Sequence, residues 1–300
     1  MKHSCQRTIG VIFAIFLLSS ELLISAGPTL AVVGGIRVAP AKRWVVTVRE
    51  LSVDSLCSGV MVAPEWVVTA EHCTYDQSGT TSVNVFVGHE TQAMLRRADV
   101  VRPSKASEFV FLHLVDLDVP ALNPIVFSPT VPPANSPLLL YGYGCTNVKQ
   151  CTATENLYAT KVNDFTAGGQ LCRTEFCVTA PKKQDRGPSG GDSGAPWFSE
   201  LNRTPEVVGI FLGYETDKTD KIKLVDVVGS GPILEAARVL GVLPTVTPGE
   251  LVATGPHATV WRVESTLRRR SVSRAWAQQQ KGPIRTLSAQ DLSSVAVQPG

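Results

Sequence analysis

The chain lacks a hydrophobic run long enough to cross a membrane. The apolar run near its N-terminus, residues 9–18, covers ten residues, whereas a membrane-spanning helix needs about 20. Basic side chains precede this run and small residues follow it, an order typical of a secretory signal peptide. We therefore expect a signal peptide in residues 1–31, with cleavage after Ala31 or, alternatively, after Ala26, and we expect the protein to be secreted.

The chain also has little excess charge and no internal repeat. Its formal net charge is +2, and 18% of its residues are charged. A strongly basic protein or a repeat array is therefore excluded, and we expect no nucleic-acid partner. We also expect no cofactor, and a monomer.

The cysteines do not have the spacing of a zinc site. No two of them form a C-x-x-C pair, and no histidine pair accompanies them, so we expect no metal. Cys5 lies in the expected signal peptide, and the other six form an even set, which in an exported chain indicates disulfides. Six cysteines allow fifteen pairings, and the sequence does not fix which occurs. We predict that neighbours pair: Cys57–Cys73, Cys145–Cys151 and Cys172–Cys177.

Short runs rich in valine, phenylalanine, tryptophan and leucine dominate the middle of the chain, and 24 glycines and 20 prolines separate them. This pattern predicts an all-β protein built of antiparallel barrels or sandwiches. The proline-rich segment 120–137 is a natural seam between two such units. The expected strands are residues 44–49, 58–62, 66–69, 82–88, 109–114 and 138–143, then 156–163, 177–180, 195–199, 206–214 and 221–228.

The end of the chain changes character. A helix is predicted over residues 232–240, with Pro232 at its first turn and Gly241 at its end. We place the main domain at residues 32–244. Residues 245–300 carry linker-like turns and a basic cluster, Arg268 to Arg270, and we expect a poorly ordered polar tail. A helix that makes weak contact with a membrane, a polyanion or a partner is the alternative.

One serine lies between glycines in the run Gly190-Gly191-Asp192-Ser193-Gly194-Ala195-Pro196. A serine hydroxyl is a weak nucleophile unless a base takes its proton and hydrogen-bond donors stabilise the oxyanion. The glycines let the backbone turn sharply, so that the amide hydrogens of Gly191 and Ser193 can point at an oxyanion. The same composition is also that of an ordinary turn, so other residues must decide between the two.

His72 supplies a candidate base. It directly precedes Cys73, and a Cys57–Cys73 bridge would restrict the turn that carries it. A general base needs such fixing, because proton transfer requires hydrogen-bond reach.

Together these runs resemble the trypsin/chymotrypsin-like serine endopeptidases. The matching runs are Val32-Val33-Gly34-Gly35 for the mature N-terminus, Cys57-Ser58-Gly59-Val60 and Thr69-Ala70-Glu71-His72-Cys73 for the histidine region, Gly191-Asp192-Ser193-Gly194-Ala195-Pro196 for the serine motif, and Val207-Val208-Gly209-Ile210 for the strand before the substrate-binding edge. The resemblance covers residues 32 to 241. It implies two six-stranded antiparallel β-barrels with the active site between them, Ser193 as nucleophile, His72 as base, and the N–H groups of Gly191 and Ser193 as oxyanion hole.

The sequence departs from the family pattern at the third catalytic residue. Glu108, before the run Phe109-Val110-Phe111-Leu112, stands where the resemblance implies an aspartate. Glutamate can orient a histidine, but its extra methylene changes the reach by about 1.5 Å. Asp116 and Asp118 are alternatives, and a degraded or inactive triad is another.

The resemblance also implies an activation salt bridge between the new N-terminal ammonium of Val32 and the carboxylate of Asp192. No lysine or arginine precedes Val32 for a trypsin-like activator to cut. We expect signal peptidase to free Val32 directly by cleaving after Ala31.

The family pattern assigns the floor of the pocket for the residue before the scissile bond to Gly187, and the edge that pairs with substrate to Leu212, Gly213 and Tyr214. No carboxylate stands at the floor unless Asp185 moves in, so small or apolar side chains are expected there. The sequence therefore predicts a secreted serine endopeptidase, and the alternative is a catalytically weak or inactive protease-like binding module.

Overall fold

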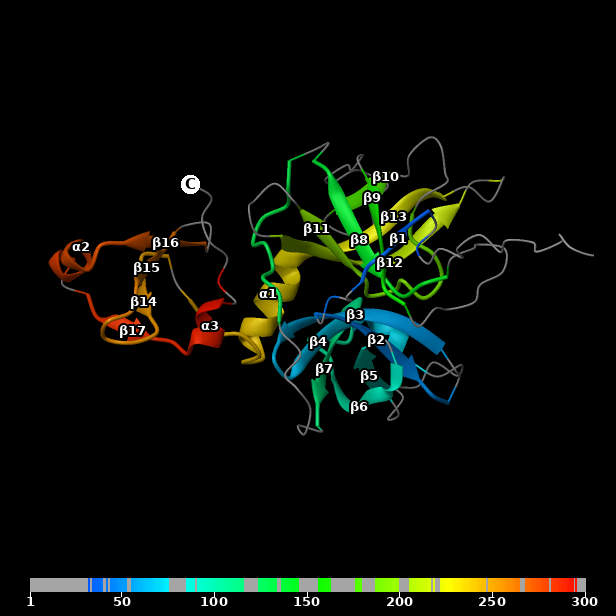
Figure 1. Cartoon of the computed structure of the whole chain (residues 1–300), viewed down its shortest axis with the longest axis horizontal. Helices are drawn as coiled ribbons and strands as arrows, with labels where there is room; N and C mark the ends of the chain where they lie inside the picture. Colours follow the sequence, from blue (N-terminus) through cyan, green and yellow to red (C-terminus); the bar gives the residue numbers. More distant parts are fainter. Residues whose placement is uncertain are drawn as a thin grey trace, which may run out of the picture.

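A computed structural model describes the chain from Val32 to Val295, with gaps (Figure 1). The described residues are 32, 34–39, 42, 44–52, 55–75, 85–89, 91–115, 124–133, 136–145, 156–162, 176–179, 187–199, 205–216, 218, 222–246, 248–264, 268–280, 282–293 and 295. The predicted signal peptide, residues 1–31, lies outside them. Among the described helices, none has the length and apolar character needed to span a membrane.

Six antiparallel strands close into a barrel in the order β2-β3-β4-β7-β6-β5. The strands are β2 (Val45–Glu50), β3 (Ser55–Ala63), β4 (Trp66–Ala70), β5 (Val85–His89), β6 (Thr91–Val101) and β7 (Phe109–Leu114). Alternating side chains such as Val46 and Val48 on β2 point into a buried core with Met61, Val67 and Leu112. The first of the two predicted barrels is thereby confirmed.

Strand β6 was not predicted from the sequence. Its polar stretch, with Arg96, Arg97 and Asp99, interrupts the apolar run that usually marks a strand. The alternation is still present at its end, because Ala98 is buried between exposed Arg97 and exposed Asp99. Antiparallel pairing with β5 on one side and β7 on the other holds this strand in the barrel.

The second unit is a seven-stranded antiparallel sheet in the order β1-β9-β8-β11-β12-β13-β10. Its strands are β1 (Ile36–Arg37), β8 (Leu138–Gly142), β9 (Tyr158–Val162), β10 (Phe176–Thr179), β11 (Pro196–Ser199), β12 (Glu206–Thr216) and β13 (Ile222–Gly229). Within the described residues this sheet has two edges, where a closed six-stranded barrel was predicted. The extra strand is β1, because Ile36 pairs with Ala159 and brings the start of the domain onto the second unit.

One core joins the two units to helix α1 (Ser230–Val239). It combines Val68 and Phe111 from the first barrel, Phe198 and Ile210 from the second unit, and Ile233 from α1. The helix begins two residues before the predicted start and ends as predicted, with Gly241 in a left-handed conformation at φ +73°. Burying this shared surface fixes how the two units face each other.

The predicted disulfide between Cys57 and Cys73 is confirmed. Cys145 is also disulfide-bonded. Its predicted partner, Cys151, and Cys172 lie outside the described residues, and the side chain of Cys177 is not described, so the other two pairings stay predictions.

The end of the chain is folded, which corrects the prediction of a poorly ordered extension. The described part of residues 245–300 forms a four-stranded sheet in the order β16-β15-β14-β17, with one helix on each face (Figure 1). We call it the C-terminal module. Its elements are β14 (Leu251–Ala253), β15 (Val260–Val263), β16 (Arg269–Val272), α2 (Arg274–Gln279), β17 (Ile284–Thr286) and α3 (Ala289–Ser293).

Strand alternation explains how a segment that the sequence marks as a polar tail still forms two apolar faces. Leu251 and Ala253 of β14 pack with Ala277 of α2 on one face, and Val252 packs with Leu292 of α3 on the other. Each face carries only a few apolar side chains, so their period of two is hard to recognise over strands of three or four residues.

The basic cluster of the module has partners within the molecule. Arg269 stacks on Trp261, Arg270 forms an ion pair with Glu264, and Arg268 is buried. The alternative of a contact between this segment and a membrane or polyanion stays a prediction. The partners within the molecule leave fewer of these arginines available for such a contact than the sequence suggests.

Candidate active site

Ser193 lies in a tight turn that directly precedes β11 of the second unit. Gly191 and Gly194 have φ of +91° and +81°, which side chains rarely adopt, and a Cβ on Gly194 would lie 2.2 Å from the Ser58 carbonyl oxygen. The N–H groups of Asp192 and Gly194 donate to Ser189 and Phe211. Among the described residues, those of Gly191 and Ser193 donate to no acceptor. These two donors are therefore free of acceptors within the described part of the chain, and their role as an oxyanion hole stays a prediction.

Ser58 of the first barrel holds this turn at both ends. Its backbone N–H donates to the Ser193 carbonyl at 2.8 Å, and its hydroxyl donates to the Gly191 carbonyl at 3.0 Å. The same hydroxyl accepts from the Tyr143 N–H at 3.0 Å, and the residue is fully buried. The sequence analysis used Ser58 only as part of a matching run and missed this role. A serine before a glycine in a strand gives no signal of a contact 133 residues away.

His72 lies on the same side of the molecule as this turn. It belongs to the short 3-10 helix η1 (Glu71–Thr74), directly after β4. The sulfur of its neighbour Cys73 lies 3.8 Å from the Ser193 carbonyl oxygen, and a ring nitrogen of His72 lies within 4.8 Å of both disulfide sulfurs. The fold thus brings together two regions that are 120 residues apart. No hydrogen bond joins the His72 ring to the Ser193 hydroxyl, although both residues are described.

The His72 ring is open to solvent on one side, and the surrounding protein removes water from the other. This desolvation holds the pKa of His72 below its ordinary value of 6.5. The imidazole is therefore in its neutral, proton-accepting form at neutral pH.

The backbone of Glu108 contacts the segment that carries His72. Its carbonyl accepts from the Glu71 N–H at 2.9 Å, so the two segments are neighbours. The Glu108 side chain is exposed, and among the described residues no hydrogen bond joins it to His72. The alternatives Asp116 and Asp118 lie outside the described residues. The role of Glu108 stays a prediction.

Asp192 is a fully buried carboxylate directly before the nucleophile. It accepts from the Gly144 N–H at 2.9 Å and from the Ser189 N–H at 2.8 Å. Desolvation is the larger effect and raises the pKa of Asp192 to about 7, despite these bonds. No cation pairs with it among the described residues. Its surroundings require glycine, because a Cβ on Gly142 or Gly144 would lie 2.0 or 2.4 Å from the carboxylate.

Ser189 is a second residue that the sequence analysis undervalued. Its hydroxyl lies 2.6 Å from the Cys145 carbonyl and 3.1 Å from an Asp192 carboxylate oxygen. One hydroxyl has one hydrogen and can donate to only one of these acceptors. Its shorter contact is with Cys145, which leaves Asp192 poorly compensated and suits a protonated carboxyl.

Val32 is fully buried in the core of the second unit, together with Ala195 and Trp197 from the strand after the nucleophile. Its φ is +51°, unfavourable for a β-branched residue by about 1–3 kcal/mol. The start of the domain is therefore held close to the nucleophile strand.

The predicted substrate pocket is described in part. Gly187 is buried with φ +151°, and Leu212, Gly213 and Tyr214 lie on β12, where a bulge precedes Gly213. The Tyr214 ring stacks on Phe211 at 6.3 Å. Asp185 lies outside the described residues.

A buried carboxylate that the sequence analysis did not consider lies on the neighbouring strand. Asp226 of β13 is the register partner of Gly213. Its neighbours Val225 and Val227 make it look like part of an ordinary core strand, so only the register reveals its position.

Cys57, His72 and Cys73 have side-chain atoms within 4.8 Å of one another, a spacing that suits a metal ion. The disulfide consumes both thiolates, so the cluster does not have the ligands of a metal site.

The chain folds into a closed β-barrel and a second β-unit, and it brings the Ser193 turn of one unit next to the His72 segment of the other. This arrangement defines a protease-like fold and site. The trypsin family model matches residues 32–227, and the chain belongs to this family. The fold is also similar to the crystal structure of a scabies mite inactivated protease paralogue, with a TM-score of 0.54 and 16% identity, over 70% of this chain and 97% of that one. The expected family and trypsin-like fold are confirmed.

The raised pKa of Asp192 makes the stability of the unprocessed chain depend on pH. Folding favours the protonated carboxyl, so this contribution is complete below about pH 4 and is lost as the pH rises through about 7. Since one pH unit is worth about 1.4 kcal/mol, the loss reaches ~4 kcal/mol. Chemical denaturation of the Ser193→Ala chain between pH 4 and pH 8 measures it. Adding Asp192→Asn should flatten the curve, and parallel curves would contradict the prediction.

Proposed function

We propose that this chain is an exported serine endopeptidase that cleaves peptide bonds through an acyl-enzyme. The observation that carries the proposal is the bonding of the Ser193 turn to the first barrel beside His72, with the N–H groups of Gly191 and Ser193 left available. A trypsin-family domain with a Cys57–Cys73 disulfide also supports export, since disulfides persist in oxidising compartments.

The proposed chemistry follows from these positions. The Ser193 hydroxyl oxygen attacks the carbonyl carbon of the scissile bond while His72 takes its proton. The Gly191 and Ser193 N–H groups hold the oxyanion. His72 then gives its proton to the departing amine as the C–N bond breaks, which leaves an ester on Ser193. A water molecule, deprotonated by His72, hydrolyses that ester and restores the serine.

We propose small or apolar side chains for the residue before the scissile bond, because glycine stands at position 187. Leu212 and Gly213 on β12 offer an edge with which substrate can pair as an added strand. Peptides with lysine or arginine belong in the same assay series, because the buried Asp226 carboxylate lies next to this edge in register.

A non-catalytic protease-like binding module is the second candidate. The specific observation that favours it is the exposed Glu108 side chain, which makes no hydrogen bond to His72 among the described residues. A histidine that no carboxylate orients is a poor base for a serine.

Labelling with a fluorophosphonate separates the two candidates. The reagent forms a bond only with an activated serine, so processed wild-type protein should be labelled and the Ser193→Ala protein should not. Labelling is read by intact mass. A correctly processed, folded wild-type protein that takes up no label would reject the peptidase and favour the binding module.

Glu108→Ala should lower kcat/KM by roughly 10²-fold or more if Glu108 orients His72, because tautomer and ring position both depend on that carboxylate. Hydrolysis of the best peptide of the series measures it. Asp116→Asn is the matched control and should have little effect. The reverse result, a large loss with Asp116→Asn alone, would transfer the role to Asp116.

Export should produce a chain that begins at Val32. Cleavage after Ala31 frees the ammonium of Val32, whose side chain packs in one core with Ala195, three residues after Asp192. Pairing of this ammonium with Asp192 would remove the cost of burying that carboxylate alone. N-terminal sequencing of the secreted protein tests this. A mature protein that began at Gly27 would be inconsistent with direct activation.

A further inference from the structure

A charged side chain of the C-terminal module is buried inside the protease domain. Arg268 is 6% exposed and its partner Glu206, the first residue of β12, is 3% exposed. The Nη1 and Nη2 atoms of Arg268 each lie 2.7 Å from one Glu206 carboxylate oxygen, the two-pronged geometry that arginine forms with carboxylates. Removing either partner would leave an unpaired charge in the interior.

The same guanidinium also binds the connection between the two barrels. Its Nη2 atom donates to the Ser128 hydroxyl at 2.8 Å. Ser128 belongs to the segment 124–133, which follows the first barrel and precedes β8. The Ser128 N–H donates to the Val207 carbonyl at 2.7 Å, and the Ser230 hydroxyl donates to the Ser128 carbonyl. Arg268 therefore sits where the connection, β12 and α1 meet.

The module reaches the first barrel as well. Asp291 of α3 lines one pocket together with Ala63, Glu65 and Trp66 from the β3–β4 turn and with Pro124 from the connection. Figure 1 shows α3 close to the end of α1 and the first barrel. The module thus lies against elements of both units.

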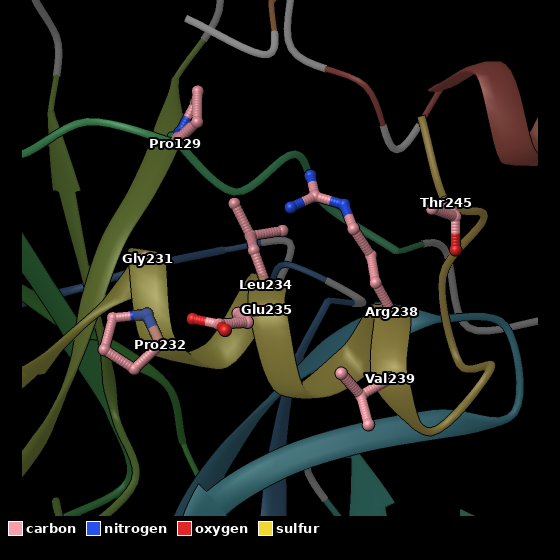
Figure 2. Close-up of a pocket in the computed structure, with 8 residues that line it drawn as sticks. All are labelled: Pro129, Gly231, Pro232, Leu234, Glu235, Arg238, Val239 and Thr245. Atoms are coloured by element: carbon pink, nitrogen blue, oxygen red, sulfur yellow. The ribbon is translucent and has the colours of Figure 1, made fainter. Parts of the chain in front are cut away.

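Apolar packing at this junction is incomplete. A pocket of about 510 Å³ remains where Pro129 of the connection, the outer face of α1 and Thr245 approach one another. Figure 2 shows Arg238 extending from α1 over Leu234 into this space.

We propose that the C-terminal module is a strap that fixes the first barrel and the second unit relative to each other, with Arg268 as its positioning residue. Arg268 does not touch the site. It ties the inter-barrel connection to β12, and β12 holds the nucleophile turn, since the Phe211 carbonyl accepts from the Gly194 N–H at 2.7 Å. His72 is on the first barrel and Ser193 on the second unit, so their alignment depends on every link between the two, and the connection adds one to the Ser58 bonds and the shared core. The catalytic consequence rests on the proposed function, whereas the strap itself does not.

Two readouts on the full chain test the strap. Hydrogen exchange at residues 126–130 and 205–210 reports the connection and the start of β12, and the second-order rate of fluorophosphonate labelling, per folded molecule, reports the site. Arg268→Met should speed exchange in both segments and slow labelling by about tenfold or more, because small displacements of reacting groups are costly. Arg268→Lys should lie between, since lysine cannot bind a carboxylate at two points.

Arg270→Met is the matched control. Arg270 is two residues away in the same basic cluster, its ion pair with Glu264 is exposed, and its loss should leave both readouts unchanged. Equal effects of Arg270→Met and Arg268→Met, or no effect of Arg268→Met, would overturn the proposal.

The double variant Arg268→Met/Glu206→Met removes both charges together, so that no unpaired charge remains buried. It keeps the test decisive if the single variant Arg268→Met does not fold. A positioning role predicts a folded protein that still labels slowly, because the bond to Ser128 is absent. Labelling at the wild-type rate would overturn that role. If the wild-type protein takes up no label, the proposed function fails and the exchange data alone decide the strap.

Discussion

The hydrogen bonds of Ser58 are the constraint on which the candidate site depends. One buried residue of the first barrel fixes both ends of the nucleophile turn, through the carbonyls of Ser193 and Gly191. Buried polar groups must be paired, so the turn and the barrel cannot separate without leaving these groups unsatisfied. The Cys57–Cys73 disulfide extends the same attachment to His72, because it joins the residue before Ser58 on β3 to the short helix that carries the histidine.

Beside this attachment lies a buried carboxyl group that no cation pairs with among the described residues. Asp192 is buried directly before Ser193, and the groups around it lower the cost of its ionisation without removing it. An ammonium at Val32 would supply the missing cation, and Val32 is already buried in the core that includes Ala195. The predicted Val32–Asp192 pair would link the order of the nucleophile turn to the state of the N-terminus through one carboxylate.

The C-terminal module adds a second kind of link between the barrels. The family match ends at residue 227, before α1 and before the module. The shared apolar core holds the barrels together without direction, whereas Arg268 binds Glu206 and Ser128 with fixed geometry. A segment that the composition marks as a tail is in this way part of the protease unit.

The sequence by itself indicated the β architecture of residues 32–241 and singled out Ser193 and His72 as candidates, because strand alternation and glycine-flanked motifs are local signals. It allowed fifteen cysteine pairings, and the structure decided the Cys57–Cys73 pair among them. The sequence could not reveal β6, whose charges hide its alternation, or the module, whose strands are too short to show a period. The roles of Ser58, Ser189, Asp226 and Arg268 were decided only by tertiary structure. Each acts on residues distant along the chain or across a sheet, and burial, register and hydrogen-bond partners exist only once the chain has folded.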